Sequence, residues 1–328
     1  MRDTSKTMQD LHDIAQRLAP ASVQAVVPIG GGANSRVFRV QTTAGSFALK
    51  SYLARPGDLR PRAAVEWQAL TFLRDRGVTA VPQPIARDAE GRYLLMEWID
   101  AKPLVHHLPA DIAAAASFLV TIFAFSADPA AADFPLASEA CLSAGEIIRQ
   151  IDQRLAALVP SPPLAAFLVE SIRPAFDEIR RKFATEPGAS AELAVRHRRL
   201  IPADFGFHNA MRASNGGLRF VDFDYFGWDD PVKLTADFIL HPGMQLSLRD
   251  KRTFVAAMVA ALGEDEHFAA RFSQYLPLHA QRWALILLNP FRSDRIVELS
   301  PEPAASALLA DRIGKARAVL AVQSKFLL

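Results

Sequence analysis

The sequence has 328 residues, of which 50% are apolar and 22% are charged, and its formal net charge is +2 at pH 7. This balance is typical of a folded globular chain long enough for one large domain or two lobes, and it excludes an intrinsically disordered protein. So small a net charge gives no indication of a nucleic-acid partner or an anionic membrane surface. The single cysteine, Cys141, excludes an intramolecular disulfide and a cysteine-based zinc site. We expect a cytoplasmic protein with no nucleic-acid and no membrane partner.

The first hundred residues predict a small mixed lobe. Residues 1–20 are polar and amphipathic, which favours a helix and lacks the apolar core of a signal peptide. Residues 22–52 hold three short runs rich in Val, Phe and Leu between glycine-containing turns, as antiparallel strands do. A helical apolar pattern over 62–77 follows, and then two more strand patterns at 83–88 and 92–99. We therefore predict a five-stranded antiparallel sheet with one helix inserted after its third strand.

The rest of the chain is predicted to be mainly helical. The apolar stretch 112–125 is shorter than the roughly 20 residues of a membrane span, so we expect a buried helix there. Strand patterns return once, over 199–224, before helices resume at about residue 233. The predicted fold class is α+β, and the predicted divisions are an N-terminal lobe (1–97), a hinge (98–103) and a helical C-terminal lobe (104–328).

Two features of the predicted sheet suit phosphate binding. The segment 29–40, IGGGANSRVFRV, has three glycines between two strands, where the backbone can approach a phosphate closely; the alternative is an ordinary turn. Lys50 lies on the next strand among apolar neighbours, and its ammonium either reaches solvent or is held inward by an anion. Glu66, on the following helix, is a candidate partner, although it could equally lie exposed. A strand lysine paired with a helix glutamate is how kinases present an ammonium to the α- and β-phosphates of ATP.

A second group of polar residues surrounds a predicted β-hairpin. The run AMRASNGGLRFVDF (210–223) has two apolar arms around Ser-Asn-Gly-Gly, which is a strong hairpin signal. Asp204 and Asn209 precede the first arm and Asp222 lies on the second, so the hairpin brings Asp222 back beside Asn209. Their side-chain oxygens suit a hard cation such as magnesium on a nucleotide. Asp204 remains as an acid that can orient or deprotonate an attacking hydroxyl.

The tripeptide Asp204-Phe205-Gly206 has the letters of the kinase metal motif, but its surroundings disagree with that assignment. A metal motif here would require a catalytic Asp, five residues before an Asn, a similar distance upstream. The segment 182–195 contains no Asp and no Asn. The spacing from Asp204 to Asn209 is that of a kinase catalytic loop, so the tripeptide is interpreted as a coincidence.

Taken together, these features resemble the aminoglycoside phosphotransferase and choline kinase group of the protein-kinase-like superfamily. The likeness runs from about residue 25 to residue 240, with the glycine loop, lysine, glutamate, a hinge in YLLMEWIDAKPL (93–104), catalytic loop and metal strand in the expected order. The resemblance implies a two-lobed kinase fold, with Asp204 as catalytic base and Asn209 and Asp222 as magnesium ligands. It also implies that ATP is bound by Gly31, Gly32, Asn34, Ser35, Lys50, Glu66, Met96, Glu97, Trp98 and Ile99.

The chain departs from the family pattern at two places. The family usually has His-Gly before the catalytic Asp, whereas Pro202 and Ala203 stand here. After the metal strand, the usual Asp-Pro-x-x-Asp keeps Asp230 and its proline but has Leu234 at the second Asp, where Asp237 could substitute one helical turn on. These departures place the chain in an outlying branch and weaken any transfer of substrate from the antibiotic kinases.

Two regions are candidates for binding the phosphate acceptor. Asp224 and Trp228 follow the metal strand and are expected to face the acceptor. On the apolar helix 278–294, Arg282 and Asn289 lie seven residues apart and therefore on one face. This polar pair belongs either to a satisfied core network or to a ligand-facing edge, where the arginine would suit a carboxylate or phosphate.

The function expected from the sequence is an ATP- and magnesium-dependent kinase that phosphorylates a hydroxyl of a small metabolite, such as a sugar or an amino alcohol. The first alternative is a pseudokinase, a nucleotide-binding regulatory protein without turnover, and the second is an aminoglycoside antibiotic kinase. An aminoglycoside calls for an acidic pocket, whereas the C-terminal third offers arginines as readily as acids. A protein kinase is disfavoured because no extended activation segment separates Asp222 from the following Asp-Pro pair.

Overall fold

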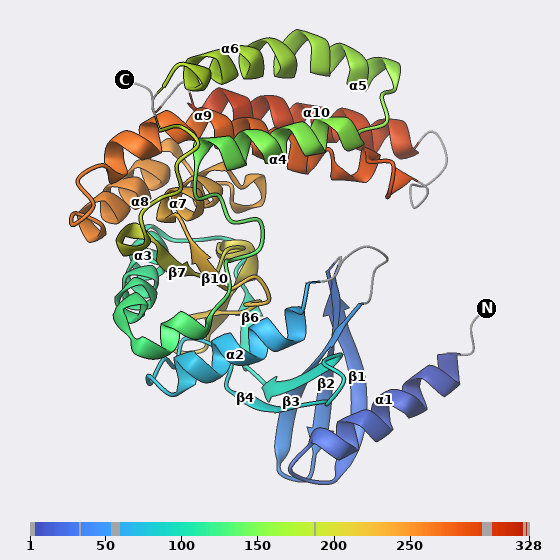
Figure 1. Cartoon of the computed structure of the whole chain (residues 1–328). Helices are drawn as coiled ribbons and strands as arrows, with labels where there is room; N and C mark the ends of the chain where they lie inside the picture. The colour runs from blue at the N-terminus through green and yellow to red at the C-terminus, as the bar shows by residue number, and fades with distance from the viewer. Residues whose placement is uncertain are drawn as a thin grey trace. The chain divides into compact units, whose positions relative to one another are not determined.

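The chain divides into two compact units (Figure 1). The computed structural model describes residues 4–32, 34–53, 60–186, 188–296, 304–323 and 326. The first unit comprises Met1–Phe118 and Pro202–Gly227, and the second comprises Leu119–Ile201 and Trp228–Leu328. This division differs from the lobes expected at 1–97 and 104–328, because the segment with the candidate catalytic residues packs with the N-terminal sheet. The lobe and hinge boundaries stay a prediction.

The sheet of the first unit is five-stranded, in the order β1-β2-β3-β5-β4, and every neighbouring pair is antiparallel. Its strands are β1 (Val23–Gly31), β2 (Ser35–Thr42), β3 (Gly45–Tyr52), β4 (Pro84–Arg87) and β5 (Tyr93–Glu97). Helix α2 (Arg62–Arg74) is inserted after β3. The predicted five-stranded sheet with one helix after its third strand is therefore confirmed.

Helix α1 (Thr4–Leu18) packs against this sheet through one apolar face. Leu11 and Ala15 are four residues apart, so they share that face, and both are buried in one core cluster. The strands contribute the other buried members of the cluster, Phe38, Val40, Leu49 and Leu95. Each large apolar side chain contributes roughly 1.5–3 kcal/mol when buried, and a shift of one residue along a strand would turn these side chains to the other face. The cluster therefore fixes the register of β3, the strand that carries Lys50.

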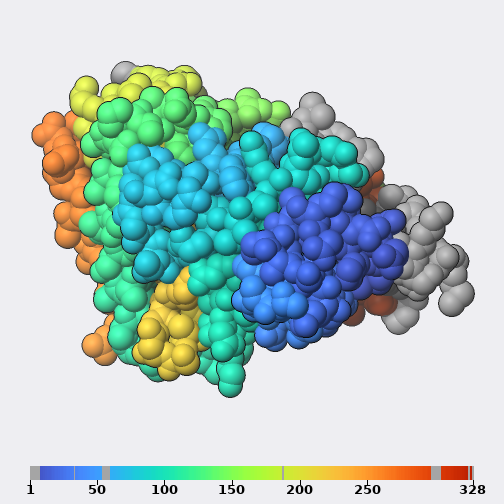
Figure 2. Space-filling model, turned by 90° about the horizontal axis from the view of Figure 1, so that it is seen from below, coloured from blue at the N-terminus to red at the C-terminus, as the bar shows by residue number. Residues whose placement is uncertain are grey.

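A second, three-stranded sheet positions the remaining candidate residues. It consists of β6 (Ala101–Pro103), β8 (Ala210–Ala213) and β9 (Leu218–Phe220), in the order β6-β8-β9. Strands β8 and β9 form the predicted hairpin, with Ala210 opposite Phe220 and with Gly216 at φ +83° in the turn. The hairpin is yellow in Figure 2, beside the teal residues near 100 that include β6. Asp222 was expected on the second strand of the hairpin, but it lies two residues beyond the end of β9.

The second unit is mainly helical. Its helices are α4 (Ala144–Ala157), α5 (Pro162–Phe167), α6 (Arg173–Ala184), α7 (Pro231–Leu240), α8 (Leu248–Ala261), α9 (Phe268–Leu287) and α10 (Ala304–Gln323). A two-stranded sheet is formed by β7 (Arg199–Ile201) and β10 (Gly227–Asp229). Helix α9 packs against α4, α7 and α10, and all ten residues of α7 are buried. The sheet and these helices confirm the predicted α+β fold class.

Helix α3 (Pro109–Ala124) contains the apolar stretch that the sequence analysis judged too short for a membrane span. With the 3-10 turn that follows, the helical segment Pro109–Ala127 has 19 residues and is long and apolar enough to cross a membrane by length and composition. Its length was underestimated because polar and proline residues at its start also join the helix. Of its most apolar window, 44% is buried, and core helices of soluble proteins meet the same criteria.

A buried histidine on α9 gives a testable prediction about stability. His279 is 0% exposed, and neither ring nitrogen has a hydrogen-bond partner among the described residues. An unpaired buried polar group costs about 1–3 kcal/mol, so we expect His279→Leu to raise the free energy of unfolding by about that amount at pH 7. Urea denaturation followed by circular dichroism measures this change.

The same substitution should change the pH dependence of stability. Burial lowers the pKa of His279 to about 3, against the raising effect of Asp237. Because the unfolded state binds the proton more tightly, this histidine removes stability as the pH falls from about 6.5 towards 3. The His279→Leu curve should be flatter over that range, whereas the exposed control His267→Leu should follow the wild type. A less stable His279→Leu protein would contradict the prediction.

Candidate functional site

A buried lysine between two carboxylates forms the centre of the candidate site. Lys50 on β3 donates to Glu66 Oε2 at 2.5 Å and to Asp222 Oδ1 at 2.6 Å. The Glu66 side chain on α2 is 1% exposed, so it is not the exposed helix residue that the sequence left open. The Lys50 ammonium is held inward by these anions instead of reaching solvent. Three residues distant in the sequence thus meet within the first unit.

The surroundings hold Lys50 charged. Burial by itself would lower the pKa of the Lys50 ammonium, but Glu66 and Asp222 outweigh it and raise that pKa above its ordinary value. Tyr52 donates its phenol to the same oxygen of Glu66 at 2.5 Å, and burial together with the charge of Glu66 raises the pKa of Tyr52 well above its usual range. The main-chain N–H of Phe223 donates to the other Glu66 oxygen at 3.2 Å. Glu66 is therefore an anchored carboxylate that fixes the lysine.

The two candidate metal ligands are brought together by the hairpin. The main-chain N–H of Val221 donates to the carbonyl of Asn209 at 2.9 Å, directly before Asp222. The Asn209 amide donates to the carbonyl of Asp204 at 2.9 Å, which leaves its side-chain oxygen available. Asp222 has φ +71°, a left-handed conformation that costs a residue with a Cβ roughly 1–2 kcal/mol. Such strain is kept where the surrounding structure fixes it, and it is common at functional sites.

This donor set suits a hard cation that is shared with a ligand. An amide oxygen and a carboxylate are oxygen donors of the kind Mg²⁺ prefers, and Mg²⁺ usually keeps only one or two protein carboxylates together with phosphates and waters. Within the described part of the chain, no group of three or more His, Cys, Asp or Glu side chains is arranged to hold a metal by itself. The residues fit a magnesium ion held jointly with nucleotide phosphates.

Asp204 lies at the start of the same segment. Its side chain is 44% exposed, and its Oδ1 lies 3.0 Å from Nε2 of His208, a partner that the sequence analysis did not predict. Ala203 before it has φ +60°, so it keeps a left-handed conformation at the position where the family usually has glycine. Although alanine replaces glycine here, the backbone keeps the conformation that glycine would favour.

A cavity of about 430 Å³ in the first unit gathers most of the predicted nucleotide and metal residues. The predicted residues that line it are Gly31, Gly32, Ser35, Lys50, Glu66, Met96, Glu97, Trp98, Ile99, Asn209 and Asp222. Apolar residues that the sequence did not predict also line it, among them Val37, Ala48, Met211 and Val221. Strand alternation alone does not reveal them, because ordinary core positions have the same pattern. Asp204 and Asn34 are not among the lining residues.

Asn34 instead connects the glycine-rich loop to the segment after Asp222. Its side-chain amide donates to the phenol oxygen of Tyr225 at 3.0 Å. The ring of Tyr225 lies under the guanidinium of Arg62, whose carbon is 4.9 Å from the ring centroid. This tether was not predicted, because Tyr225 lies 191 residues from Asn34 in the chain.

Removing this tether should weaken nucleotide binding more than turnover. We expect Tyr225→Phe, which keeps the ring but loses the hydroxyl, to raise KM for ATP about 3- to 10-fold, because the glycine-rich loop without its tether must be ordered when the nucleotide binds. The kcat should change by less than about 2-fold, because the bond is the same in the ground and transition states. Steady-state ADP release measures both constants. The matched control is Tyr275→Phe, and a Tyr225→Phe enzyme with unchanged KM would contradict the role.

Asp224 and Trp228, two of the predicted acceptor residues, have different neighbours. Asp224 is buried beside Arg62, with the two side chains 4.0 Å apart, and burial followed by the charge of Asp222 raises the pKa of Asp224 to about 8. The Trp228 indole donates to the carbonyl of Ala131 at 2.9 Å. Their proposed contact with an acceptor stays a prediction.

Arg282 and Asn289 have polar partners inside the second unit. Arg282 is 3% exposed and bonds to Gln150, Asp237 and Glu139. Asn289 accepts a hydrogen bond from Arg154 at 3.1 Å. Of the two alternatives left open by the sequence, this geometry corresponds to a satisfied core network, and binding of an acceptor by either residue stays a prediction.

Comparison with known proteins decides the family. The family model described as "Phosphotransferase enzyme family", APH, matches residues 25–272. The chain belongs to the APH phosphotransferase family. The match includes Lys50, Glu66, Asp204, Asn209 and Asp222, and it ends before Arg282 and Asn289. No curated protein matches the sequence.

Solved structures similar to this APH-family protein share its fold. Choline kinase LicA from Streptococcus pneumoniae has a TM-score of 0.62 and 16% sequence identity, and the match covers 95% of this chain and 99% of that chain. Choline kinase from Cryptosporidium parvum has a TM-score of 0.58 and 13% identity, covering 97% and 96%. Spectinomycin phosphotransferase APH(9)-Ia, in complex with ADP and spectinomycin, has a TM-score of 0.62 and 13% identity, covering 96% and 97%. The APH-family protein thus has the protein-kinase-like fold of small-molecule phosphotransferases.

Proposed function

We propose that this APH-family protein is an ATP- and Mg²⁺-dependent phosphotransferase that transfers the γ-phosphate to a hydroxyl group of a small metabolite. The observation that carries the proposal is the position of Lys50 between Glu66 and Asp222 at the edge of the 430 Å³ cavity. A lysine fixed by a helix glutamate beside a metal-binding aspartate is the arrangement that kinases use to hold ATP phosphates. Neighbouring structures crystallised with AMP and ADP support a nucleotide in this role.

Each residue of the site has a definite part in such a reaction. The glycine-rich loop offers backbone N–H groups to the phosphates, and Lys50 offers an ammonium that stays charged. Asn209 and Asp222 would hold the magnesium ion, which neutralises charge on the phosphate oxygens when bound. Asp204 would accept the proton of the attacking hydroxyl or orient it in line with the γ-phosphate. Because little covalent chemistry falls to the protein, positioning and electrostatics supply most of the rate.

The acceptor is proposed to be a hydroxylated metabolite, such as a sugar or an amino alcohol. The related structures include choline kinases, and others hold the antibiotics spectinomycin and hygromycin B. These proteins share at most 18% identity with this chain, so their likeness identifies the fold and not the acceptor. A hydroxyl acceptor is the property that the proposed role of Asp204 requires.

ADP release tests the proposal directly. The full chain is incubated with ATP, Mg²⁺ and a panel of sugars, amino alcohols and aminoglycosides, and each reaction is repeated with EDTA. We expect ADP release that needs both an acceptor and Mg²⁺. A thermal shift with ATP and Mg²⁺, but no ADP release with any acceptor, would favour the pseudokinase alternative. ADP release that is insensitive to EDTA would contradict the proposed magnesium site.

A further inference from the structure

The helical unit contains a cavity of its own, of about 890 Å³. It lies beside helix α4 and the loop that precedes it, and it is lined mostly by polar and charged side chains. Ligand sites are commonly concave, with a few polar groups held in fixed positions. None of the residues assigned to the nucleotide or the metal lines this cavity. Binding of the nucleotide and the metal therefore does not account for this cavity.

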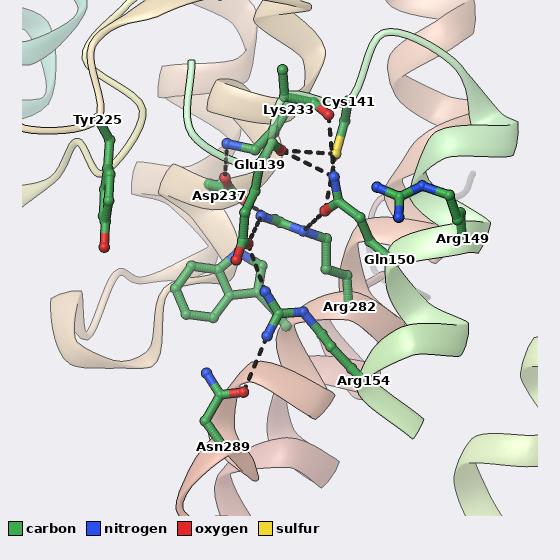
Figure 3. Close-up of polar contacts among 12 residues, drawn as sticks. Glu139, Cys141, Arg149, Gln150, Arg154, Tyr225, Lys233, Asp237, Arg282 and Asn289 are labelled. Carbon is green, nitrogen blue, oxygen red and sulfur yellow. Dashed lines mark hydrogen bonds and ion pairs between the residues drawn. The ribbon is translucent and has the colours of Figure 1, made fainter. Parts of the chain in front are cut away.

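The carboxylate of Glu139 is held in a fixed orientation in the wall of this cavity. Arg154 donates to Glu139 Oε2 at 2.6 Å and Arg282 donates to the same oxygen at 3.1 Å, and both contacts are drawn in Figure 3. The Glu139 side chain remains 41% exposed, so it is not covered by the two arginines. Burial alone would raise the pKa of Glu139, but the two guanidinium groups lower it to about 2. The group is therefore an ionised acceptor of hydrogen bonds at any physiological pH.

A buried network holds this carboxylate in place from behind. Gln150 on α4 accepts from Arg282 at 3.0 Å and donates to the main-chain carbonyl of Glu139 at 3.3 Å. Arg282 also donates to Asp237, and Asp237 pairs with Lys233 at 3.1 Å on the fully buried helix α7. Figure 3 shows these side chains converging on Glu139 from α4, α7 and α9. A group fixed in this way loses little conformational entropy when it binds a ligand.

The backbone conformation of Glu139 also indicates that its side chain is held in a fixed position. Glu139 has φ +55°, a left-handed conformation that is costly for a residue with a Cβ. The hydrogen bonds from Arg154, Arg282 and Gln150 hold the residue there. Backbone strain that is maintained by a specific network is frequent where a side chain must be presented to a ligand.

Acidic and basic side chains line the cavity in equal number, which restricts the net charge of a ligand that it can bind. Three acids and three bases line it: Glu139, Glu146, Glu192, Arg149, Arg154 and Arg292. An excess of acid, which a polycation requires, is therefore absent from the described lining residues. The described lining also contains no Phe, Tyr or Trp, so it offers neither the aromatic cage that recognises a quaternary ammonium nor a surface on which a flat base could stack.

We propose that this cavity binds an electrically neutral, non-aromatic compound rich in hydroxyl groups, such as a sugar or a cyclic polyol, with Glu139 accepting hydrogen bonds from its hydroxyls. Hydroxyls are both donors and acceptors, so a surface of carboxylates, amides and guanidinium groups satisfies them without a net charge on the ligand. Gln153, an exposed residue of α4 in the lining, adds an amide beside the charged groups. This ligand class is the same as that of the proposed hydroxylated acceptor. The identification of the ligand with the phosphate acceptor rests on the proposed function, whereas the binding of such a ligand does not.

Binding without nucleotide tests this inference. Isothermal titration calorimetry on the full chain is carried out with D-glucose, D-ribose and myo-inositol as neutral probes, and with choline and hygromycin B as cationic probes. We expect at least one neutral probe to bind, and to bind at least 10-fold more tightly than either cation. Binding of a cation in preference to every neutral probe, or binding of no neutral probe at millimolar concentration, would overturn the proposed ligand class.

Three variants locate the binding site. Glu139→Gln keeps the shape of the side chain but removes its charge, and should weaken binding about 10- to 100-fold, the effect of a hydrogen bond to a charged group. Gln153→Trp adds bulk from an exposed helix position and should abolish binding without disturbing the buried network. Glu178→Gln, on the exposed face of α6, is the matched control and should leave the affinity unchanged. Unchanged affinity in both cavity variants would overturn the site.

The outcome is separable from that of the phosphotransferase proposal. Loss of neutral-ligand binding in Gln153→Trp, with Mg²⁺-dependent ATP binding retained, would support a ligand site in the helical unit. If wild-type protein binds the neutral probe but releases no ADP with it, the inference stands and phosphoryl transfer to that compound fails. If ADP release occurs with an acceptor but both cavity variants bind that acceptor as the wild type does, the proposed function stands and the inference fails.

Discussion

Asp204→Asn is expected to lower kcat by about 10²- to 10⁴-fold, the usual contribution of a positioned general base. The substitution removes the proton acceptor and keeps the size of the side chain. Affinity for ATP should change little, because Asp204 is not among the residues lining the 430 Å³ cavity. Steady-state ADP release with the best acceptor gives kcat, and the thermal shift with ATP and Mg²⁺ reports nucleotide binding.

The controls for Asp204→Asn separate chemistry from folding. Asp177→Asn, at an exposed position on α6, is the matched control and should retain wild-type kcat. His208→Ala removes the residue whose Nε2 lies 3.0 Å from Asp204 and should cost less than Asp204→Asn itself. Wild-type turnover in Asp204→Asn would disprove the role of Asp204 as base.

Lys50→Met should reduce kcat/KM by at least about 10²-fold, because it removes the ammonium proposed to contact the ATP phosphates. It should also destabilise the fold, since breaking a buried ion pair by removing one partner costs about 3–5 kcal/mol. Lys50 and Glu66 have side chains only 7% and 1% exposed, so water cannot compensate the remaining carboxylate. Activity is measured by ADP release and stability by urea denaturation.

A second substitution distinguishes the two effects of Lys50→Met. The double variant Lys50→Met with Glu66→Gln removes both charges of the pair, so it should recover part of the lost stability while staying inactive. Lys182→Met, at an exposed position on α6, is the control for loss of a positive charge. A double variant that recovers activity together with stability would mean that Lys50 has a structural role only.

Local patterns in the sequence were sufficient to predict the five-stranded sheet and the β-hairpin of the first unit. Alternating apolar residues around short turns predicted the five strands, and the Ser-Asn-Gly-Gly turn predicted the hairpin that brings Asp222 to Asn209. The absence of a second Asp and Asn upstream separated the catalytic-loop spacing from the metal tripeptide. The predictions of the sheet and the hairpin succeeded because strand pairing across short turns is a local property. The assignment of Asp204 and Asn209 to a catalytic loop stays a prediction.

Contacts between distant segments were decided only by the tertiary structure. The sequence left open whether Glu66 is exposed, whether Lys50 points inward, and whether Arg282 lies in a core network, because side-chain burial depends on which elements pack together. The tether between Asn34 and Tyr225 joins residues 191 apart, and Glu139 showed no motif at all. The sequence by itself determined the order of the strands, the inserted helix and the hairpin, and the chemical types of the candidate site residues. The tertiary structure decided which charges are paired, because only packing brings Arg154 and Arg282 to one carboxylate and leaves that carboxylate facing a cavity.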